Sequence, residues 1–192
     1  MTARLIRLGR PDAATLDELL ERARTAALTY DHVGSTLPRS DGPEAGVRKE
    51  GLDLGVGAAA FEAAVDGLRS WACHRGLGAT VHPADAPLTV GTTLLVVLGA
   101  GPVSIVVPDR IVAVIDEPRR FGFAYGTLEG HQERGEESFL VEHLDDDRVV
   151  ATIGLDAHPA TPAARLAAPA VAWFQRIAVR RYLLGLRGAV SS

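Results

Sequence analysis

The chain has 192 residues, a net charge of −4, 47% apolar residues and 23% charged residues. This length and balance are typical of a globular protein with one domain and a substantial core, and we expect residues 1–192 to form that single domain. The acidic balance argues against the basic excess of nucleic-acid-binding proteins, so no nucleic acid is expected as a partner.

Targeting and redox signals are few. The lone cysteine, Cys73, excludes an internal disulfide, and its position at the end of a helical pattern favours a buried structural thiol. The opening residues MTARLIRLGRPD have no apolar stretch long enough for a signal peptide, so a cytoplasmic protein is expected. Residues 88–108 carry no charge, but the turn signal at 99–102 and the β-branched residues on both sides predict a hairpin rather than a membrane span.

The first third of the chain predicts two helices. A short strand is expected over 3–8, followed by a helix from Asp12 to Ala27 with leucines on one side. Residues 28–55 have an irregular pattern, with a strand near 47–54. The second helix is predicted over 56–74 from the helical spacing of its apolar residues.

Residues 79–157 predict an antiparallel sheet of five or six strands, because β-branched and aromatic runs alternate there with Pro and Gly. The strands are placed near 79–83, 92–99, 103–115, 120–127, 136–143 and 148–156.

A long last helix is predicted over 162–186. Its inward stripe is expected to contain Leu166, Trp173, Ile177 and Leu184. Its arginines gather on a different face, which is either solvated or a partner or membrane surface; they are Arg165, Arg176, Arg180 and Arg187. The segregation of helices and strands predicts an α+β fold, in which a curved antiparallel sheet packs against the last helix and leaves a cavity between them.

Four stretches of this chain resemble an uncharacterised bacterial and plant family, catalogued as a domain of unknown function. They are TYDHVGST, GLDLGVGAAAF, FGFAYGTLEGHQERGEESFLVE and FQRIAVRRYL, which occur in that order along the chain. The family is similar to the START-like helix-grip superfamily. This resemblance implies a curved sheet gripping a long C-terminal helix, with two shorter helices near the N-terminus.

The resemblance also implies a function class, because that superfamily mostly binds hydrophobic small molecules or lipids and includes some cyclases and hydrolases. No catalytic residues can be transferred, since none is established for the family. The stretch HPATPAAR departs from the Ser-Arg-Pro-like sequence expected there, which puts any serine or arginine role at that point in doubt.

The strand over 120–127 is the first candidate for a ligand site. Alternation places Phe121, Phe123, Tyr125 and Thr127 on one face, which is either plain core or a pocket wall with two polar anchors. Trp173 of the last helix is expected in the core and also at this pocket.

The connection and strand that follow supply the candidate catalytic residues. His131 and Glu137, with Tyr125, could perform acid/base chemistry, or could serve structure or orient a ligand. Glu137 shares its strand face with Phe139, so it is expected to point inward and to need a partner, with His131 and Arg134 nearest in sequence. The spacing matches no metal motif, and neither a metal nor another cofactor is predicted.

Three hypotheses for the function remain open at the level of sequence. The first is a protein that binds a hydrophobic or amphipathic small molecule or lipid between the sheet and the last helix. The second is an enzyme that uses His131 and Glu137. The third is an interaction module that uses the arginine face of the last helix. The oligomeric state is not indicated by the sequence.

Overall fold

The computed structural model describes residues 6–37, 47–100, 102–160, 166 and 168–191. Short helices lie early in the chain, most of the sheet lies in the middle, and one long helix lies at the end. In chain order they are β1 (Ile6–Leu8), α1 (Ala13–Arg24), β2 (Arg48–Val56), α2 (Gly57–Arg69), α3 (Ala72–Leu77), β3 (Ala79–His82), β4 (Thr93–Ala100), β5 (Val103–Glu117), β6 (Arg120–Thr127), β7 (Glu133–His143), β8 (Arg148–Pro159) and α5 (Ala168–Val190).

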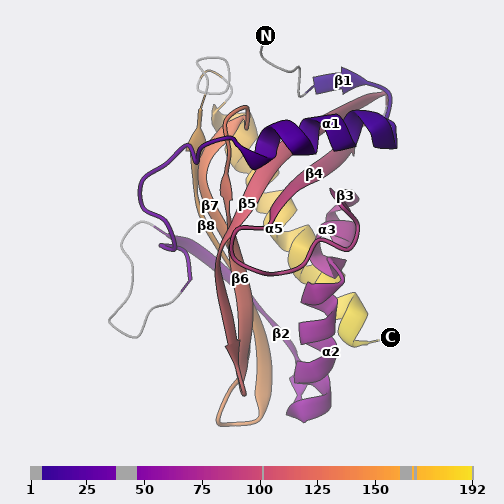
Figure 1. The fold of residues 1–192 in the computed structure, drawn as a ribbon. Coiled ribbons are helices and arrows are strands. Elements are labelled where there is room, and N and C mark those ends of the chain that lie inside the picture. The colour runs from indigo at the N-terminus through magenta and orange to yellow at the C-terminus, as the bar shows by residue number, and fades with distance from the viewer. Residues whose placement is uncertain (1–5, 38–46, 101, 161–165, 167, 192) are drawn as a thin grey trace.

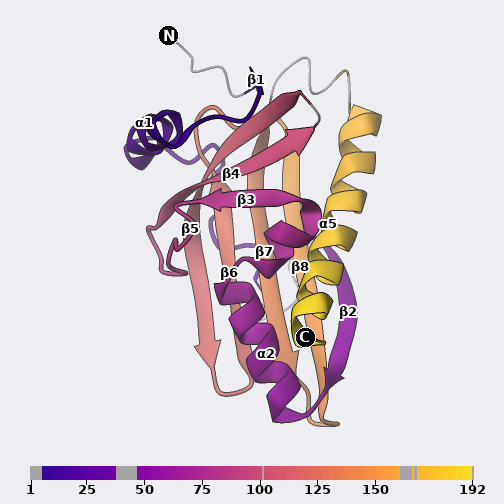
Figure 2. The ribbon, with the colours of Figure 1, turned by 90° about the vertical axis from the view of Figure 1, so that its right-hand side faces the viewer.

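The strands form one antiparallel sheet in the order β2-β8-β7-β6-β5-β4-β3, with β1 paired to β5. Figure 1 views this sheet close to edge-on, with α2, α3 and α5 on one side and the segment 25–37 on the other. We call the first side the inner face and the second the outer face. Figure 2 shows α5 running along the inner face beside α2 and α3. The predicted α+β helix-grip architecture is therefore confirmed.

The predicted strands of the middle block are present with small differences at their ends. The uncharged stretch 88–108 contains the β4–β5 hairpin, whose register runs from Ala100↔Val103 to Thr93↔Arg110. The six strands placed from residue 79 onward correspond to β3 through β8, and the strands expected over 3–8 and near 47–54 correspond to β1 and β2, which also join the sheet and make it eight-stranded. Among the described residues, no helix is both long enough and apolar enough to cross a membrane.

The helix predicted over 56–74 is interrupted, which corrects the expectation of one continuous helix. Trp71 has φ 61, a left-handed conformation that an α-helix cannot contain, so α2 ends before it and α3 begins after it. The indole Nε1 of Trp71 donates to the carbonyl oxygen of Ala86 at 3.2 Å, which holds this turn against the core. The prediction of a buried thiol is confirmed, because Cys73 is 1% exposed.

The short helix α3 lies unusually close to α5. A Cβ at Gly76 would lie 2.5 Å from the Cα of Gly185, and a Cβ at Gly185 would lie 2.6 Å from the carbonyl oxygen of Ala72. Two glycines therefore allow the helices to cross almost backbone to backbone. This contact anchors the C-terminal half of α5 on the inner face.

The inward stripe predicted for the last helix was wrong, because the buried residues of α5 lie about one position away from the predicted ones. Trp173 is 60% exposed and Leu184 is 48% exposed, whereas Ala178 and Tyr182 are buried. The buried side of α5 is mostly apolar, but apolar residues also occur on its exposed side, so the apolar periodicity indicated the helix without selecting the correct face; the buried residues are Ala178, Val179, Tyr182, Leu183 and Leu186. The predicted start of this helix at Pro162 lies outside the described residues.

Candidate functional site

A cavity of about 370 Å³ lies between the inner face of the sheet and α5. Its apolar wall comes from α3, β4 and β5, and includes Leu77, Leu98, Ile105 and Val107. The opposite part is polar, with side chains from β5, β6, β7 and α5. A volume of this size and this division of surface are typical of small-molecule sites in proteins.

Tyr125 and Glu137 form the central polar pair of the cavity. They lie directly opposite each other in the β6–β7 ladder, and the Tyr125 hydroxyl donates to Glu137 Oε2 at 2.7 Å. Burial raises the pKa of Glu137 to about 7, although the hydrogen bond from Tyr125 opposes this shift. The carboxyl group of Glu137 is therefore poised to gain or lose a proton near neutral pH.

Behind this pair lies His74 of α3, which is 1% exposed. Its Nε2 is 3.3 Å from the Tyr125 hydroxyl oxygen, and burial lowers its pKa to about 3. Since Tyr125 donates its own proton to Glu137, the neutral imidazole is the donor to Tyr125. His74, Tyr125 and Glu137 thus form a hydrogen-bonded chain from the core to the cavity.

Asp109 of β5 is the second carboxyl group of the cavity and is 1% exposed. Its Oδ1 is buried and makes no hydrogen bond among the described residues. Burial raises its pKa well above the ordinary value, and the nearby charges of Glu137 and Glu133 add to the effect. An acidic side chain in this state is costly unless something supplies a partner.

His131 lies beside Asp109, in the connection between β6 and β7. Its Nδ1 accepts from the backbone N–H of Glu133 at 2.9 Å, so the proton of the neutral ring is on Nε2. That Nε2 lies 3.8 Å from Asp109 Oδ1, which is too far for a hydrogen bond. Burial lowers the pKa of His131 to about 4, and the ring is therefore neutral at physiological pH.

Glu133 is the third carboxyl group of the cavity, and it has partners. Gln175 Nε2 of α5 donates to Glu133 Oε1 at 2.5 Å, and Arg48 Nη2 donates to Gln175 Oε1 at 3.1 Å. Burial raises the pKa of Glu133, while the bond from Gln175 and the charge of Arg48 oppose that shift. The chain of contacts joins β2, α5 and β7 at this end of the cavity.

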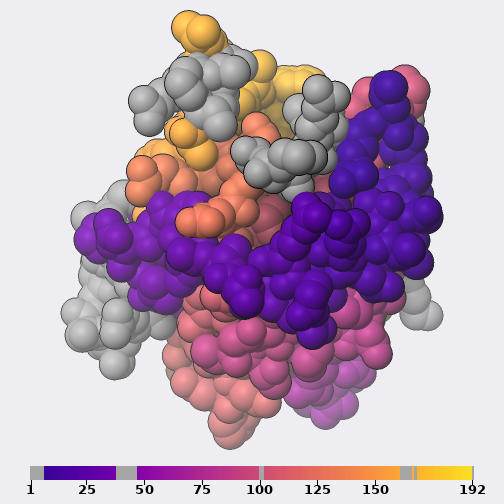
Figure 3. All heavy atoms as spheres, turned by 45° about the horizontal axis from the view of Figure 1, so that its top comes forward, coloured from indigo at the N-terminus to yellow at the C-terminus, as the bar shows by residue number. Residues whose placement is uncertain are grey.

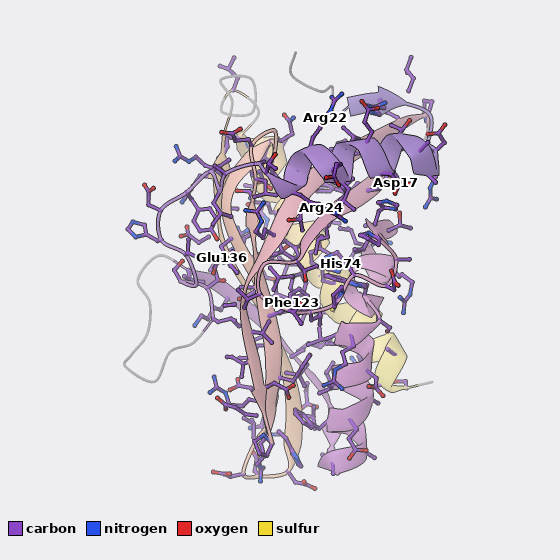
Figure 4. The ribbon with its side chains drawn as sticks, viewed as in Figure 1. Asp17, Arg22, Arg24, His74, Phe123 and Glu136 are labelled. Atoms are coloured by element: carbon purple, nitrogen blue, oxygen red, sulfur yellow. The ribbon has the colours of Figure 1, made fainter. Side chains whose placement is uncertain are left out.

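The neighbouring Glu136 belongs to the outer face and is 1% exposed. Its carboxylate accepts from the Tyr30 hydroxyl at 2.8 Å, from the Gly34 N–H at 2.7 Å, and from the Thr36 N–H and hydroxyl at 2.9 and 2.5 Å. The stretches TYDHVGST and GEESF therefore meet in space around one carboxylate. Figure 4 shows Glu136 on the outer side of the sheet, opposite Phe123 and His74.

The outer face is covered by the early part of the chain, which includes α1 and the segment 25–37. Figure 3 shows these residues as a continuous band across the strands. A Cβ at Gly126 would overlap the Tyr30 hydroxyl, so this glycine makes room for the tyrosine that bonds Glu136. Thr127 is held by Thr29, with the two hydroxyl oxygens 2.5 Å apart.

The structure brings four of the predicted site residues to one cavity. Tyr125, Thr127, His131 and Glu137 all line it, with the hydroxyl of Thr127 also bonded to the backbone of Gly135. The partner of Glu137 is Tyr125, and not His131 or Arg134 as predicted, because Tyr125 is its cross-strand neighbour.

The other predicted ligand residues lie elsewhere. Phe123 is 1% exposed and packs edge-on against Trp71, and Phe121 lies under the guanidinium of Arg69, 4.7 Å from its ring centroid. Both are core residues outside the cavity lining. Trp173 points outward from α5 and is absent from the lining, which corrects its predicted burial.

The predicted arginine face is partly described. Arg176, Arg180 and Arg187 are exposed on α5, as expected for a solvated face, whereas Arg165 lies outside the described residues. Among the described residues, no group of three or more His, Cys, Asp and Glu side chains is arranged to hold a metal ion.

Sequence reasoning missed Asp109, His74 and Glu133. For Asp109 a signal was present, because strand alternation from Ile105 and Val107 places residue 109 on the inner face. His74 and Glu133 had no comparable signal, since their contacts come from the packing of distant elements.

A curved antiparallel sheet that grips a long C-terminal helix over a cavity defines the helix-grip class of folds. The crystal structure of hypothetical protein jhp0584 from Helicobacter pylori has this chain's fold at 16% identity and TM-score 0.56, covering 85% of this chain and 98% of that one. A conserved protein from Geobacillus kaustophilus matches at 11% identity and TM-score 0.50, covering 76% and 93%.

The family is shown by sequence. The model described as Domain of unknown function (DUF1990) matches residues 29–184, and the chain belongs to this family. A UPF0548 protein from Deinococcus radiodurans is 31% identical over 182 residues, which cover 90% of this chain and 92% of that protein. The family resemblance predicted from the four stretches is confirmed.

Proposed function

We propose that this protein binds an apolar or amphipathic small molecule, of the size of a short lipid or a fused-ring compound, in the cavity between the sheet and α5. The observation that carries the proposal is the cavity itself. It has a volume of about 370 Å³, an apolar wall and a cluster of polar side chains opposite that wall. Apolar side chains that border a cavity of this size lack protein atoms on one side, so a ligand that contacts them gains dispersion and hydrophobic binding free energy.

The position of α5 supports the same proposal. Val171, Phe174 and Ala178 of this helix line the cavity, while α3 fixes only the C-terminal half of the helix through the Gly76–Gly185 crossing. The N-terminal half of α5 covers the cavity without so close a backbone contact. A small displacement of that half would admit a ligand, as lids do in other binding proteins.

The test compares a variant whose cavity is filled by a larger side chain with a variant that has the same substitution on the surface. Ala157 of β8 lines the cavity, and Ala157→Phe places a ring in it; Ala59→Phe makes the same substitution at an exposed position of α2. We expect the environment-sensitive probe N-phenylnaphthylamine to bind the wild type and Ala59→Phe, and Ala157→Phe to bind it at least about tenfold more weakly. Equal binding by all three proteins would contradict the proposal.

A second candidate function is proton transfer on the bound molecule. It is favoured by one observation, the Glu137 carboxyl group, which has a pKa near 7 and bonds Tyr125 inside the cavity. An enzyme of this kind would convert a bound compound into an isomer or hydrolysis product. Incubating a small-molecule extract with the wild type and with Glu137→Gln, followed by mass spectrometry and chromatography, tests it: a product formed by the wild type alone is expected, and identical extracts would contradict it.

A further inference from the structure

We propose that the molecule bound in the cavity is an amphipathic amine, with its cationic head at Asp109 and Glu137 and its apolar body against β4 and β5. This inference rests on the binding function proposed above and adds the chemical class of the ligand. It is carried by the balance of charge around the cavity, by one buried oxygen without a partner, and by the location of the apolar wall.

The cavity lining contains acidic groups and no basic side chain of the kind that would neutralise them. Asp109, Glu133 and Glu137 contribute carboxyl groups, and no lysine or arginine is among the described residues of the lining. Glu136 also borders the cavity, but its carboxylate is bonded to Tyr30, Gly34 and Thr36 on the outer face. Arg48 lies outside the lining and is bonded to Gln175; its charge opposes the rise in pKa of Glu133 and Glu137. The histidines do not supply positive charge either, because burial lowers the pKa of His131 to about 4 and that of His74 to about 3. The same burial raises the pKa of Asp109 and Glu137 and favours their neutral form, whereas a cation bound beside them favours the charged form. A cation from outside the protein is therefore the complementary partner that lets these groups ionise.

The three carboxyl groups differ in how far the protein already satisfies them. Glu133 accepts from Gln175, which in turn accepts from Arg48. Glu137 accepts one hydrogen bond, from Tyr125. Asp109 Oδ1 accepts none among the described residues, although the side chain is 99% removed from solvent. The unmet need for a donor is therefore greatest at Asp109 and next at Glu137.

The independent observation at this site is the Asp109 oxygen. Asp109 lies opposite Thr127 in the β5–β6 ladder, and its side chain is on the face that lines the cavity. A register shift between Ile111 and Ala113 bends β5 two residues further on. Bulges of this kind commonly re-aim side chains beside functional sites. An acceptor that is buried at the edge of a cavity without a partner among the described residues is the arrangement that a ligand donor completes.

The apolar part of the cavity specifies the rest of the ligand. Apolar side chains of β4 and β5 line the inner face here, namely Val96, Leu98, Ile105 and Val107. Ile105 and Val107 are on the same strand as Asp109. A molecule with its head at Asp109 therefore lies along apolar side chains. Fatty acids and other anionic amphiphiles have the matching body, but an ionised acid head group has no hydrogen to donate to Asp109 Oδ1 and would bring a further negative charge to the carboxyl groups.

The experiment compares octylamine, octanol and octanoate, which share one chain and differ in the head group. Calorimetric affinities near neutral pH are expected to rank octylamine tightest and octanoate weakest, with octylamine at least about tenfold tighter than octanol, since hydrogen bonds to a charged group have this strength. The variants Asp109→Asn and Glu137→Gln are each expected to remove most of the amine's advantage while retaining affinity for octanol. Glu129→Gln, at an exposed position of the preceding turn, removes the same charge and is expected to keep the advantage.

The outcomes separate this inference from the binding function on which it rests. If octanol binds and octylamine binds no more tightly, the amine class is wrong and the binding function stands. If the advantage of octylamine persists in both Asp109→Asn and Glu137→Gln, the head group is not at these residues and the inference is also wrong. If none of the three compounds binds the folded wild type, the proposed function itself fails.

Discussion

Glu136 and Glu137 are adjacent in sequence, yet they lie on opposite faces of the sheet with opposite surroundings. Glu136 accepts four hydrogen bonds from the Tyr30, Gly34 and Thr36 groups that cover the outer face. Glu137 accepts one hydrogen bond, from Tyr125, and borders a cavity on the inner face. One carboxylate is saturated by the fold, and the other has capacity left for a ligand or a proton.

This difference teaches how a strand can carry structure and function in consecutive residues. Alternation sends successive side chains to different layers, so the outer layer can be closed while the inner layer stays open. The outer layer ties the segment 25–37 to the middle of the sheet, and the inner layer forms the proposed site. The two layers can be tested separately by single substitutions.

The largest effect is expected from Glu136→Gln. The amide cannot accept all four hydrogen bonds and presents a donor to groups that are themselves donors, so buried N–H and O–H groups lose their partner. We expect a loss of about 4 kcal/mol in the free energy of unfolding, which is roughly a 10 °C decrease in Tm for a chain of this length. Calorimetric or circular-dichroism melting measures it.

The matched control is Glu142→Gln, the same substitution on the same strand. Glu142 makes a surface ion pair with Arg120 at 3.2 Å, and such pairs contribute less than about 1 kcal/mol. A Tm for Glu136→Gln that falls no further than that of Glu142→Gln would show that the outer carboxylate does not hold the layer together.

Glu137→Gln is expected to have the second largest effect, on the pH dependence of stability. The free energy of unfolding of the variant relative to the wild type should change by about 3 kcal/mol over the range given below. Burial raises the pKa of Glu137 from 4.5 to about 7, so the folded protein binds this proton more tightly than the unfolded chain does. The stability contributed by the protonated form is complete below pH 4.5 and is lost as pH rises through 7. The glutamine variant has no such loss, so its Tm minus that of the wild type is expected to increase across this range.

The difference between the two proteins removes the contributions of His74 and His131, because both titrate in each protein. It reports Glu137 together with its effect on Asp109, whose pKa the charge of Glu137 raises. The pKa values of the two histidines are lowered to about 3 and about 4, so on their own they destabilise the fold as pH falls below their ordinary range. A Tm difference that stays constant between pH 4.5 and 7 would contradict the description of Glu137 as a buried, weakly satisfied carboxyl group.

The smallest effect, about 2 kcal/mol, is expected from Gly126→Ala. The added methyl group would lie 2.6 Å from Tyr30 Cε1 and would push the tyrosine away from Glu136. Gly99→Ala is the control, because a Cβ at that strand glycine has no neighbour within 4 Å. Equal melting temperatures for the two variants would mean that Tyr30 does not need this close approach.

The sheet and the inward direction of Glu137 were predictable from sequence because both depend on local alternation. The strands from residue 79 onward follow from runs of β-branched and aromatic residues, and strand parity alone places Glu137 beside Phe139. The same parity, counted from Ile105 and Val107, places Asp109 on the inner face.

Other features depended on contacts between distant segments and could not be read from one stretch. The partner of Glu137 is fixed by the register of β6 and β7, and the partners of Glu136 come from residues 30–36, a hundred positions earlier in the chain. The inward side of α5 was misassigned because apolar residues occur on both sides of this helix, and Leu166, Trp173 and Leu184 are exposed. The break at Trp71 depends on a left-handed residue that helical periodicity does not indicate.

The most direct measurement is the carboxyl carbon-13 NMR signal of Glu136 and Glu137 during a titration with octanol, a neutral ligand that requires only the proposed binding function. Saturable movement of the Glu137 signal, with the Glu136 signal unchanged, is the predicted result. Saturable binding that leaves Glu137 unchanged, or a titration in which neither signal moves because octanol does not bind, would contradict the account that the inner layer is the open one.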